Sequence, residues 1–168
     1  PMIRQGLHIH ITSEKKDGSY IRITRNMMAE FGVEVTFDGE NYLVPGHASY
    51  HRDAYTVEPD MSAACYFYGA AAITGGRALV RHVHPDNTQG DVKFLSVLEQ
   101  MGCAVTDTPR GIVVTGPDVG GLSGIDLDMN DFSDQALTLA AIAPFANSPV
   151  HIRNIAHIRG QECDRLHA

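Results

Sequence analysis

An internal repeat of about 70 residues constrains the fold of this 168-residue chain more than any other feature. Residues 26–46 align without a gap with residues 96–116, so that Gly32 matches Gly102 at a distance of 70 positions. Solenoid repeats are shorter, about 20–50 residues, whereas a small α/β unit needs a period of this length. We therefore expect the chain to contain copies of one α/β building block.

A second pair of segments repeats at an offset of 72 positions. The Ala-rich residues 64–71 resemble residues 136–143, and residues 79–83 resemble residues 151–155. The small side chains of the Ala-rich segments allow helices to pack closely. Together with the first repeat, this order predicts an α/β (α+β) fold of repeated βαβαββ units, which run strand–helix–strand–helix–strand–strand.

Apolar spacing and turn residues predict the positions of the elements. Two runs with helical spacing end at Gly32 and Gly102, and glycine tolerates the left-handed conformation that terminates a helix. Short β-branched segments bounded by turn residues predict strands, and the turn sequences at residues 38–41 and 108–111 predict hairpins. The predicted strands are Leu7–Thr12, Val33–Phe37, Tyr42–Pro45, Ala104–Thr106 and Ile112–Thr115, and the predicted helices are Ile21–Phe31, 63–73, Val92–Met101, 135–146 and 159–168.

The repeats also predict the domain organisation. The chain starts and stops out of phase with the unit, as expected for a segment of a longer protein. Residues 57–60 fall between one completed unit and the next, so we expect a boundary between two lobes there. Residues 1–58 are expected to end one lobe as a partial unit, and residues 59–168 to form part of the second lobe, with one unit and the start of the next.

Composition argues against several classes of partner. The formal net charge of −7 disfavours a nucleic-acid backbone, and no apolar run is long enough to span a bilayer. Residues 1–5 do not resemble a signal peptide. The three cysteines are far apart and odd in number, which indicates reduced thiols and a cytoplasmic location. His8 and His10 alternate on a predicted strand, but two histidines are too few for a structural zinc site, so we assign no metal.

Two groups of ionisable residues stand at the starts of predicted helices, where anions bind and carboxylate pKa values shift. Asp134 follows Ser133, a good helix N-cap, and its simplest role is to complement the helix dipole. Glu162 and Arg165 are three positions apart, so they share a face of a helix and could simply form an ion pair there. The alternative is acid/base chemistry on an anionic substrate.

Five motifs, in order and at matching spacing, resemble the 5-enolpyruvylshikimate-3-phosphate synthase family, and the likeness covers essentially the whole chain. They are Ser19–Thr24, Val57–Phe67, Gln89–Gly102, Asp128–Ala140 and Glu162–Leu166. The resemblance implies two inside-out α/β lobes of three units each, as in enolpyruvyl transferases, with the active site in the cleft between them. The chain would then hold roughly two-fifths of the family's usual length.

The resemblance also implies roles for three residues. The aspartate that matches Asp134 holds the attacking 5-hydroxyl of shikimate-3-phosphate and accepts its proton. The glutamate that matches Glu162 handles the proton at the methylene carbon of phosphoenolpyruvate. The arginine that matches Arg165 clamps phosphoenolpyruvate, because a guanidinium fork suits a carboxylate or a phosphate.

Three further positions are implied to bind substrate. Tyr20 matches a tyrosine that lines the shikimate-3-phosphate site, although it could instead pack on the sheet. His157 stands where an Asn or His binds that substrate. Gln161 departs from the family's usual Lys and so removes a cation. Asp17 stands where many members have a Ser that contacts the phosphate, and that contact is expected to be lost.

Four polar residues near the predicted helix starts are expected to be structural. Asp60 and Ser62 are expected to cap the helix of residues 63–73. Gln89 and Asp91 also have the character of capping residues. No substrate contact is assigned to any of the four.

The implied reaction adds the 5-hydroxyl to phosphoenolpyruvate and then eliminates phosphate, with no metal or organic cofactor. Several basic segments of the family's active site are absent from this chain, so we expect the isolated segment to be catalytically silent. Exposed apolar surface is also expected to make it self-associate. Two alternatives remain open: a UDP-N-acetylglucosamine enolpyruvyl transferase, which shares the fold, or a non-catalytic α/β domain.

Overall fold

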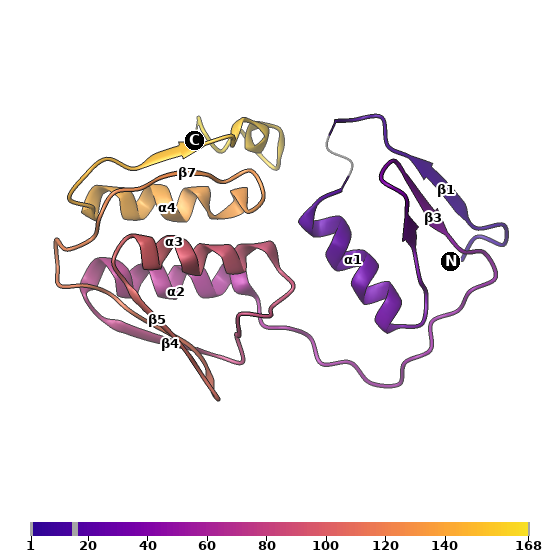
Figure 1. The fold of residues 1–168 in the computed structure, drawn as a ribbon, viewed down its shortest axis with the longest axis horizontal. Helices are drawn as coiled ribbons and strands as arrows, with labels where there is room; N and C mark the ends of the chain where they lie inside the picture. Colours follow the sequence, from indigo (N-terminus) through magenta and orange to yellow (C-terminus); the bar gives the residue numbers. More distant parts are fainter. Residues whose placement is uncertain (1, 15–16, 168) are drawn as a thin grey trace. The chain divides into compact units, whose positions relative to one another are not determined.

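The structure, a computed structural model, describes residues 2–14 and 17–167 and contains two compact units (Figure 1). Unit 1 is Pro1–Val57 and unit 2 is Glu58–Ala168. The assignment of these units to two lobes of a longer protein stays a prediction. Among the described residues, no helix combines the length and apolar character needed to cross a membrane.

Unit 1 is one helix and a three-stranded antiparallel sheet of order β1-β3-β2. Its small core includes Val33, Val35 and Tyr42, and the ring of Phe37 stacks on that of Tyr42 with centroids 4.3 Å apart. Arg25 of the helix lies over both rings, so the helix is held to the sheet by cation–π contacts as well as by apolar packing. The elements are β1 (Leu7–His10), α1 (Ser19–Glu30), β2 (Thr36–Phe37) and β3 (Asn41–Val44).

Unit 2 contains a second three-stranded antiparallel sheet, of order β4-β6-β5, and a parallel pair of strands, β7 and β8. Its elements are α2 (Met61–Thr74), β4 (Arg77–Arg81), η1 (Gly90–Lys93), α3 (Phe94–Gln100), β5 (Ala104–Thr108), β6 (Gly111–Thr115), β7 (Asp126–Asp128), η2 (Ser133–Gln135), α4 (Ala136–Ile142), η3 (Ala143–Phe145), β8 (His151–Arg153) and η4 (Ala156–Gly160), where η denotes a 3₁₀-helix.

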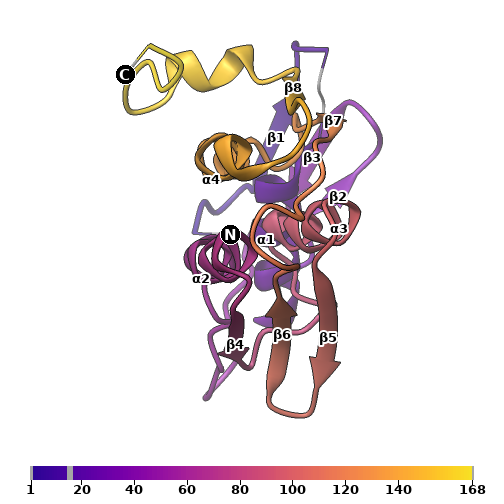
Figure 2. The same ribbon diagram turned by 90° about the vertical axis from the view of Figure 1, so that its left-hand side faces the viewer.

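The elements of unit 2 form layers. The β4-β6-β5 sheet is covered by α2 and α3, α4 packs on α2, and β7 and β8 lie beyond α4 (Figure 2). The position of α2 between the sheet and α4 explains why many of its apolar side chains are buried, whereas Tyr66 and Phe67 remain exposed. The largest fully buried side chains of this core include Tyr68, Phe94, Met61, Leu98, Met101 and Leu139.

The sequence repeat is a structural repeat. Thr36 pairs with Leu43 in unit 1, and the residues 70 positions later, Thr106 and Val113, pair in unit 2. Both sheets also place their third strand between the first and the second. The helices preceding the hairpins end at glycines with positive φ, 89° at Gly32 and 105° at Gly102. The predicted α/β class, the helix ends and the hairpins are therefore confirmed.

The predicted helix at 159–168 is wrong over residues 159–167, and Ala168 lies outside the described residues. Residues 156–160 form the 3₁₀-helix η4, and residues 161–167 form bends and a turn. Asp164 provides the physical reason, because its carboxylate accepts the backbone N–H groups of Leu166 at 3.1 Å and His167 at 3.2 Å. It also pairs with Arg159 at 2.8 Å. These local hydrogen bonds satisfy backbone groups that a helix would otherwise use.

Other element boundaries also differ from the predictions. The segment predicted as one helix at 135–146 is divided into η2, α4 and η3, and Pro144 near the start of η3 removes a backbone donor there. The helix predicted from Val92 begins as the 3₁₀-helix η1. Residues 45–60, which are all described, form no strand, so the unit pattern before α2 lacks its first strand.

The turn between β2 and β3 depends on the Asp38 carboxylate. It accepts the backbone N–H groups of Glu40 at 2.9 Å and Asn41 at 2.7 Å, and the Asn41 side-chain amide at 3.0 Å. The Glu40 N–H has the largest effect, and together these donors lower the pKa of Asp38 to about 2.

We expect this carboxylate to support the hairpin fully above about pH 4, the pKa of an unfolded Asp. Because the pKa in the folded protein is lower, that support should be lost as the pH falls through about 2. An NMR titration of the Asp38 carboxyl carbon measures the midpoint directly. A midpoint near 3.9 would contradict the hydrogen-bonded turn.

Candidate active site

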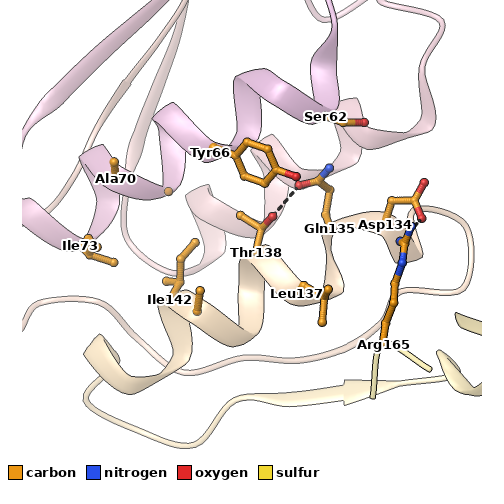
Figure 3. A pocket seen from close by; sticks show the side chains of 12 residues that line it. Ser62, Tyr66, Ala70, Ile73, Asp134, Gln135, Leu137, Thr138, Ile142 and Arg165 are labelled. Carbon is orange, nitrogen blue, oxygen red and sulfur yellow. Dashed lines mark hydrogen bonds and ion pairs between the residues drawn. The ribbon is translucent and has the colours of Figure 1, made fainter. Parts of the chain in front are cut away.

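A cavity of about 560 Å³ lies in unit 2 between α2 and α4 (Figure 3). Its walls are apolar, and one end carries Ser62, Asp134 and Arg165. Gly69 allows the close approach of the two helices, because a Cβ at this position would lie 3.2 Å from the Ile142 side chain. The remaining lining residues are Tyr66, Ala70, Ile73, Gln135, Leu137, Thr138 and Ala141.

At the polar end of this cavity, the Arg165 guanidinium pairs with two carboxylates, of which only that of Asp134 lines the cavity. Arg165 Nη1 donates to Asp134 Oδ1 at 3.0 Å, and Arg165 Nη2 donates to Glu162 Oε2. The Arg165 side chain is 22% exposed and that of Asp134 is 30% exposed, whereas Glu162 is 76% exposed. The shared guanidinium therefore connects a half-buried carboxylate beside the cavity to a carboxylate in solvent.

Gln161 and His157 lie beside this pair. Gln161 Nε2 is 3.4 Å from Asp134 Oδ1, and His157 Nε2 is 2.9 Å from Ser133 Oγ. Five of the six residues with predicted site roles thus gather around the turn 133–135. The sequence predicted Ser133 as a helix N-cap, and this is wrong, because Ser133 is the first residue of η2 and its hydroxyl contacts His157.

The profile of the family described as EPSP synthase (3-phosphoshikimate 1-carboxyvinyltransferase) matches residues 1–168. The chain belongs to the EPSP synthase family. The 3-phosphoshikimate 1-carboxyvinyltransferase of Nostoc punctiforme is 53% identical over 151 residues, which are 89% of this chain and 35% of that protein. The one of Trichormus variabilis is 46% identical over 169 residues, which are 100% of this chain and 39% of that protein. The chain thus spans less than two-fifths of the length of these relatives.

Solved structures show the same fold. EPSP synthase from Acinetobacter baumannii superposes with a TM-score of 0.71 at 21% identity, covering 98% of this chain and 38% of that chain. The enolpyruvyl transferase NikO from Streptomyces tendae gives a TM-score of 0.62 at 18% identity, covering 89% of this chain and 36% of that chain. The α/β units described above are therefore those of the enolpyruvyl transferase fold.

The remaining predicted site residue, Tyr20, lies in unit 1. It is the second residue of α1 and is 59% exposed, so it is not an aromatic buried against the sheet. Asp17, predicted to lose a phosphate contact, is held within unit 1 instead. Its carboxylate accepts from Arg22 at 3.2 Å and from the Tyr42 hydroxyl at 3.0 Å. Both substrate assignments stay predictions.

The four residues predicted to cap helices have two different roles. Asp60 is the N-cap of α2 and accepts the Ala63 N–H at 3.0 Å, as predicted. Gln89 also serves α2, since its Oε1 accepts the Met61 N–H at 2.9 Å. Ser62 and Asp91 do not cap, because the Ser62 hydroxyl donates to the Asp91 carboxylate.

Sequence reasoning missed Gln135, which belongs to this polar group. Gln135 is 1% exposed, and its Nε2 donates to Asp91 Oδ2 at 2.9 Å while its Oε1 accepts from Thr138 at 3.0 Å. The sequence did contain a signal, because Gln135 is a lone amide at the start of an apolar, Ala-rich helix. A polar side chain buried at such a position requires hydrogen-bond partners. No group of three or more metal-ligating side chains occurs among the residues that the structure describes.

The environment of Glu162 favours its charged form. Its own backbone N–H contributes most, and then the hydrogen bond and charge of Arg165 lower the pKa of Glu162 further. Burial and the Asp134 charge oppose this shift but are weaker. The guanidinium thus adds to the lowering of the Glu162 pKa that the backbone N–H begins.

Replacing Arg165 by glutamine is expected to raise the pKa of Glu162, because one hydrogen bond and a positive charge are removed. An NMR titration of the Glu162 carboxyl carbon measures the change. Arg159→Gln is the matched control, since Arg159 pairs with Asp164 and not with Glu162. Equal shifts in the two variants would show that the Arg165 contact does not control Glu162.

Proposed function

We propose that the full-length protein transfers the enolpyruvyl group of phosphoenolpyruvate to the 5-hydroxyl of shikimate-3-phosphate and releases phosphate, a step of the shikimate pathway. The observation that carries this proposal is the sharing of Arg165 by Asp134 and Glu162 at the mouth of one cavity. Membership of the EPSP synthase family supports it, as do relatives that carry the name of this transferase.

The proposed reaction needs a base, an acid and a cation. Asp134 accepts the proton of the attacking hydroxyl as its oxygen bonds to C2 of phosphoenolpyruvate, and Glu162 delivers a proton to the methylene carbon. The tetrahedral intermediate then loses phosphate from C2, and Glu162 takes back a proton from the methyl carbon, which restores the double bond. Arg165 binds the phosphoenolpyruvate anion through its planar fork. No metal or organic cofactor is needed for these steps.

Binding of phosphoenolpyruvate to Arg165 is expected to raise the pKa of Glu162. An anion that binds the Arg165 guanidinium competes with the Glu162 carboxylate for the same donors. As Glu162 loses that contact, its pKa rises and it gains a proton more easily.

Three further residues are proposed to contact shikimate-3-phosphate: His157, Gln161 and Tyr20. The positions of His157 and Gln161 beside Asp134 support this for two of them. For Tyr20 the support is its exposure at the first turn of α1 and the match to the family motif.

A phosphate-release assay on the full-length protein tests the proposed function. Turnover is expected with phosphoenolpyruvate and shikimate-3-phosphate, and none with phosphoenolpyruvate and UDP-N-acetylglucosamine. Turnover with phosphoenolpyruvate and UDP-N-acetylglucosamine, but not with phosphoenolpyruvate and shikimate-3-phosphate, would assign the protein to the other transferase activity. The 168-residue chain assayed by itself is expected to release no phosphate, because other parts of the proposed site lie outside it.

We also propose that the chain, when isolated, self-associates. Several large apolar side chains of unit 1 are exposed on β1, α1 and β3, including Ile9, Ile21, Met27 and Leu43. Uncovered apolar surface of this kind favours association. Light scattering is expected to show a mass above 18.3 kDa that rises with concentration. A constant monomer mass would contradict this.

The proposed location is cytoplasmic. Cys65, Cys103 and Cys163 are all free thiols. Burial raises the pKa of Cys65 and raises that of Cys103 to about 11, so both remain protonated and unreactive at neutral pH. Free buried thiols are usual in a reducing compartment.

A further inference from the structure

Asp91 is a buried carboxylate that the proposed reaction does not use. It is the second residue of η1, is 5% exposed, and lies behind the wall of the cavity rather than in it. Charged side chains are seldom buried without hydrogen-bonding or charged partners, because losing their hydration water is energetically costly. The hydrogen bonds of Asp91 therefore indicate which segments this buried carboxylate connects.

Both side-chain hydrogen bonds of Asp91 converge on one oxygen. Oδ2 accepts from the Ser62 hydroxyl of α2 and from the Gln135 amide of η2, the latter at 2.9 Å. The Thr138 hydroxyl adds a further hydrogen bond to this series by donating to Gln135 Oε1 at 3.0 Å. One carboxylate thus ties together three segments that are far apart in the sequence.

Gln135 is adjacent in the chain to Asp134, and both belong to η2. A 3₁₀-helix has about three residues per turn, so neighbouring side chains point in different directions. In Figure 3, Gln135 points toward α2 while Asp134 points toward Arg165. Holding the Gln135 side chain therefore restricts the rotation of the turn that carries Asp134.

A second contact between η1 and the same region is exposed. Lys93 Nζ lies 3.1 Å from Asp131 Oδ2, and both side chains are 50% exposed. Exposed ion pairs contribute little, because water and salt screen the two charges. The buried Asp91–Gln135 contact is thus the stronger connection between η1 and the turn.

We propose that Asp91 is a positioning residue, which holds Gln135 from behind the cavity and thereby orients Asp134 for proton transfer. The catalytic part rests on the proposed function. The mechanical part, that Asp91 orders the turn 133–136, stands independently of it. Asp91 itself touches no substrate in this proposal.

Hydrogen exchange tests the mechanical part on the full-length protein without any assay of activity. Gln135→Met removes the amide donor and keeps the side chain's length, and Asp91→Leu removes the acceptor. Both are expected to speed exchange of the amides in residues 133–136. Two control variants should leave the exchange of these amides unchanged. Lys93→Ala removes the exposed ion pair, and Ser62→Ala removes the hydrogen-bond donor that α2 provides to Asp91. Unchanged exchange in Gln135→Met, or an equal increase in Ser62→Ala, would overturn the proposal.

Turnover tests the catalytic part. Gln135→Met and Asp91→Leu are expected to lower kcat by on the order of 10²-fold with little change in KM, because small misplacements of a catalytic group are costly. Asp91→Asn, whose amide oxygen can still accept both hydrogen bonds, should recover most of that loss. Lys93→Ala should stay close to the parent protein.

A double-mutant cycle separates positioning from general destabilisation. If Gln135 and Asp91 act through Asp134, their substitution should have no further effect once Asp134 is alanine. Additive losses would overturn the catalytic part. Absence of turnover in the parent protein would reject the proposed function, and hydrogen exchange alone would then decide whether Asp91 orders the turn.

Discussion

Replacing Asp134 by alanine in the full-length protein is expected to lower kcat by about 10²- to 10⁴-fold, the range for loss of a general base. The carboxylate lies at the polar end of the cavity in a half-buried position, 3.0 Å from Arg165. Steady-state phosphate release at saturating substrate measures the loss. The free energy of unfolding should change little, since the side chain is 30% exposed.

Asp131→Ala is the matched control for this prediction. Asp131 lies three positions earlier, is 50% exposed and pairs with Lys93 rather than with Arg165. Its loss should leave kcat within about twofold, because an exposed ion pair contributes little. A protein in which Asp134→Ala lowers stability but not turnover would be a non-catalytic domain, with Asp134 serving only the helix start.

The largest effect on stability is expected from Phe94→Ala. Phe94 is the first residue of α3, is 0% exposed and packs in the core of unit 2. Truncating a buried phenylalanine removes apolar burial and leaves a cavity, which together cost about 3–5 kcal/mol. That is a large share of the stability of a small domain, so guanidinium chloride unfolding should show a much lower midpoint.

Phe67→Ala is the matched control, because it makes the same substitution at an exposed phenylalanine. Phe67 belongs to α2 and is 63% exposed, so its truncation in the 168-residue chain should change the unfolding free energy by less than about 0.5 kcal/mol. Equal losses for the two variants would mean that α3 does not form the core described here.

Short-range sequence features were sufficient to predict the order of helices and strands in the repeated unit. The repeat at 70 positions, glycines that end helices and polar turn residues at hairpins are short-range signals. They predicted a repeated unit with a hairpin in each copy, and the equivalent pairings of Thr36 with Leu43 and of Thr106 with Val113 confirm this repeat. The motifs also predicted the family, because residue type and spacing are properties of the chain alone.

Local reasoning failed where a side chain found a partner that sequence spacing does not reveal. Ser133 has the residue type of an N-cap, but its hydroxyl contacts His157, 24 positions later. The C-terminal segment has helical spacing, but Asp164 captures the backbone donors that a helix needs. In each case a specific hydrogen bond outweighed an intrinsic preference.

The sequence by itself determined the repeated α/β unit, its hairpins, its helix ends and its family, because these depend on residues close together in the chain. Only the tertiary structure decided which charged groups meet. Asp134 and Arg165 are 31 positions apart, and Asp91 and Gln135 are 44 positions apart. Such contacts depend on how the layers of unit 2 pack, and packing is a property of the folded chain rather than of any segment.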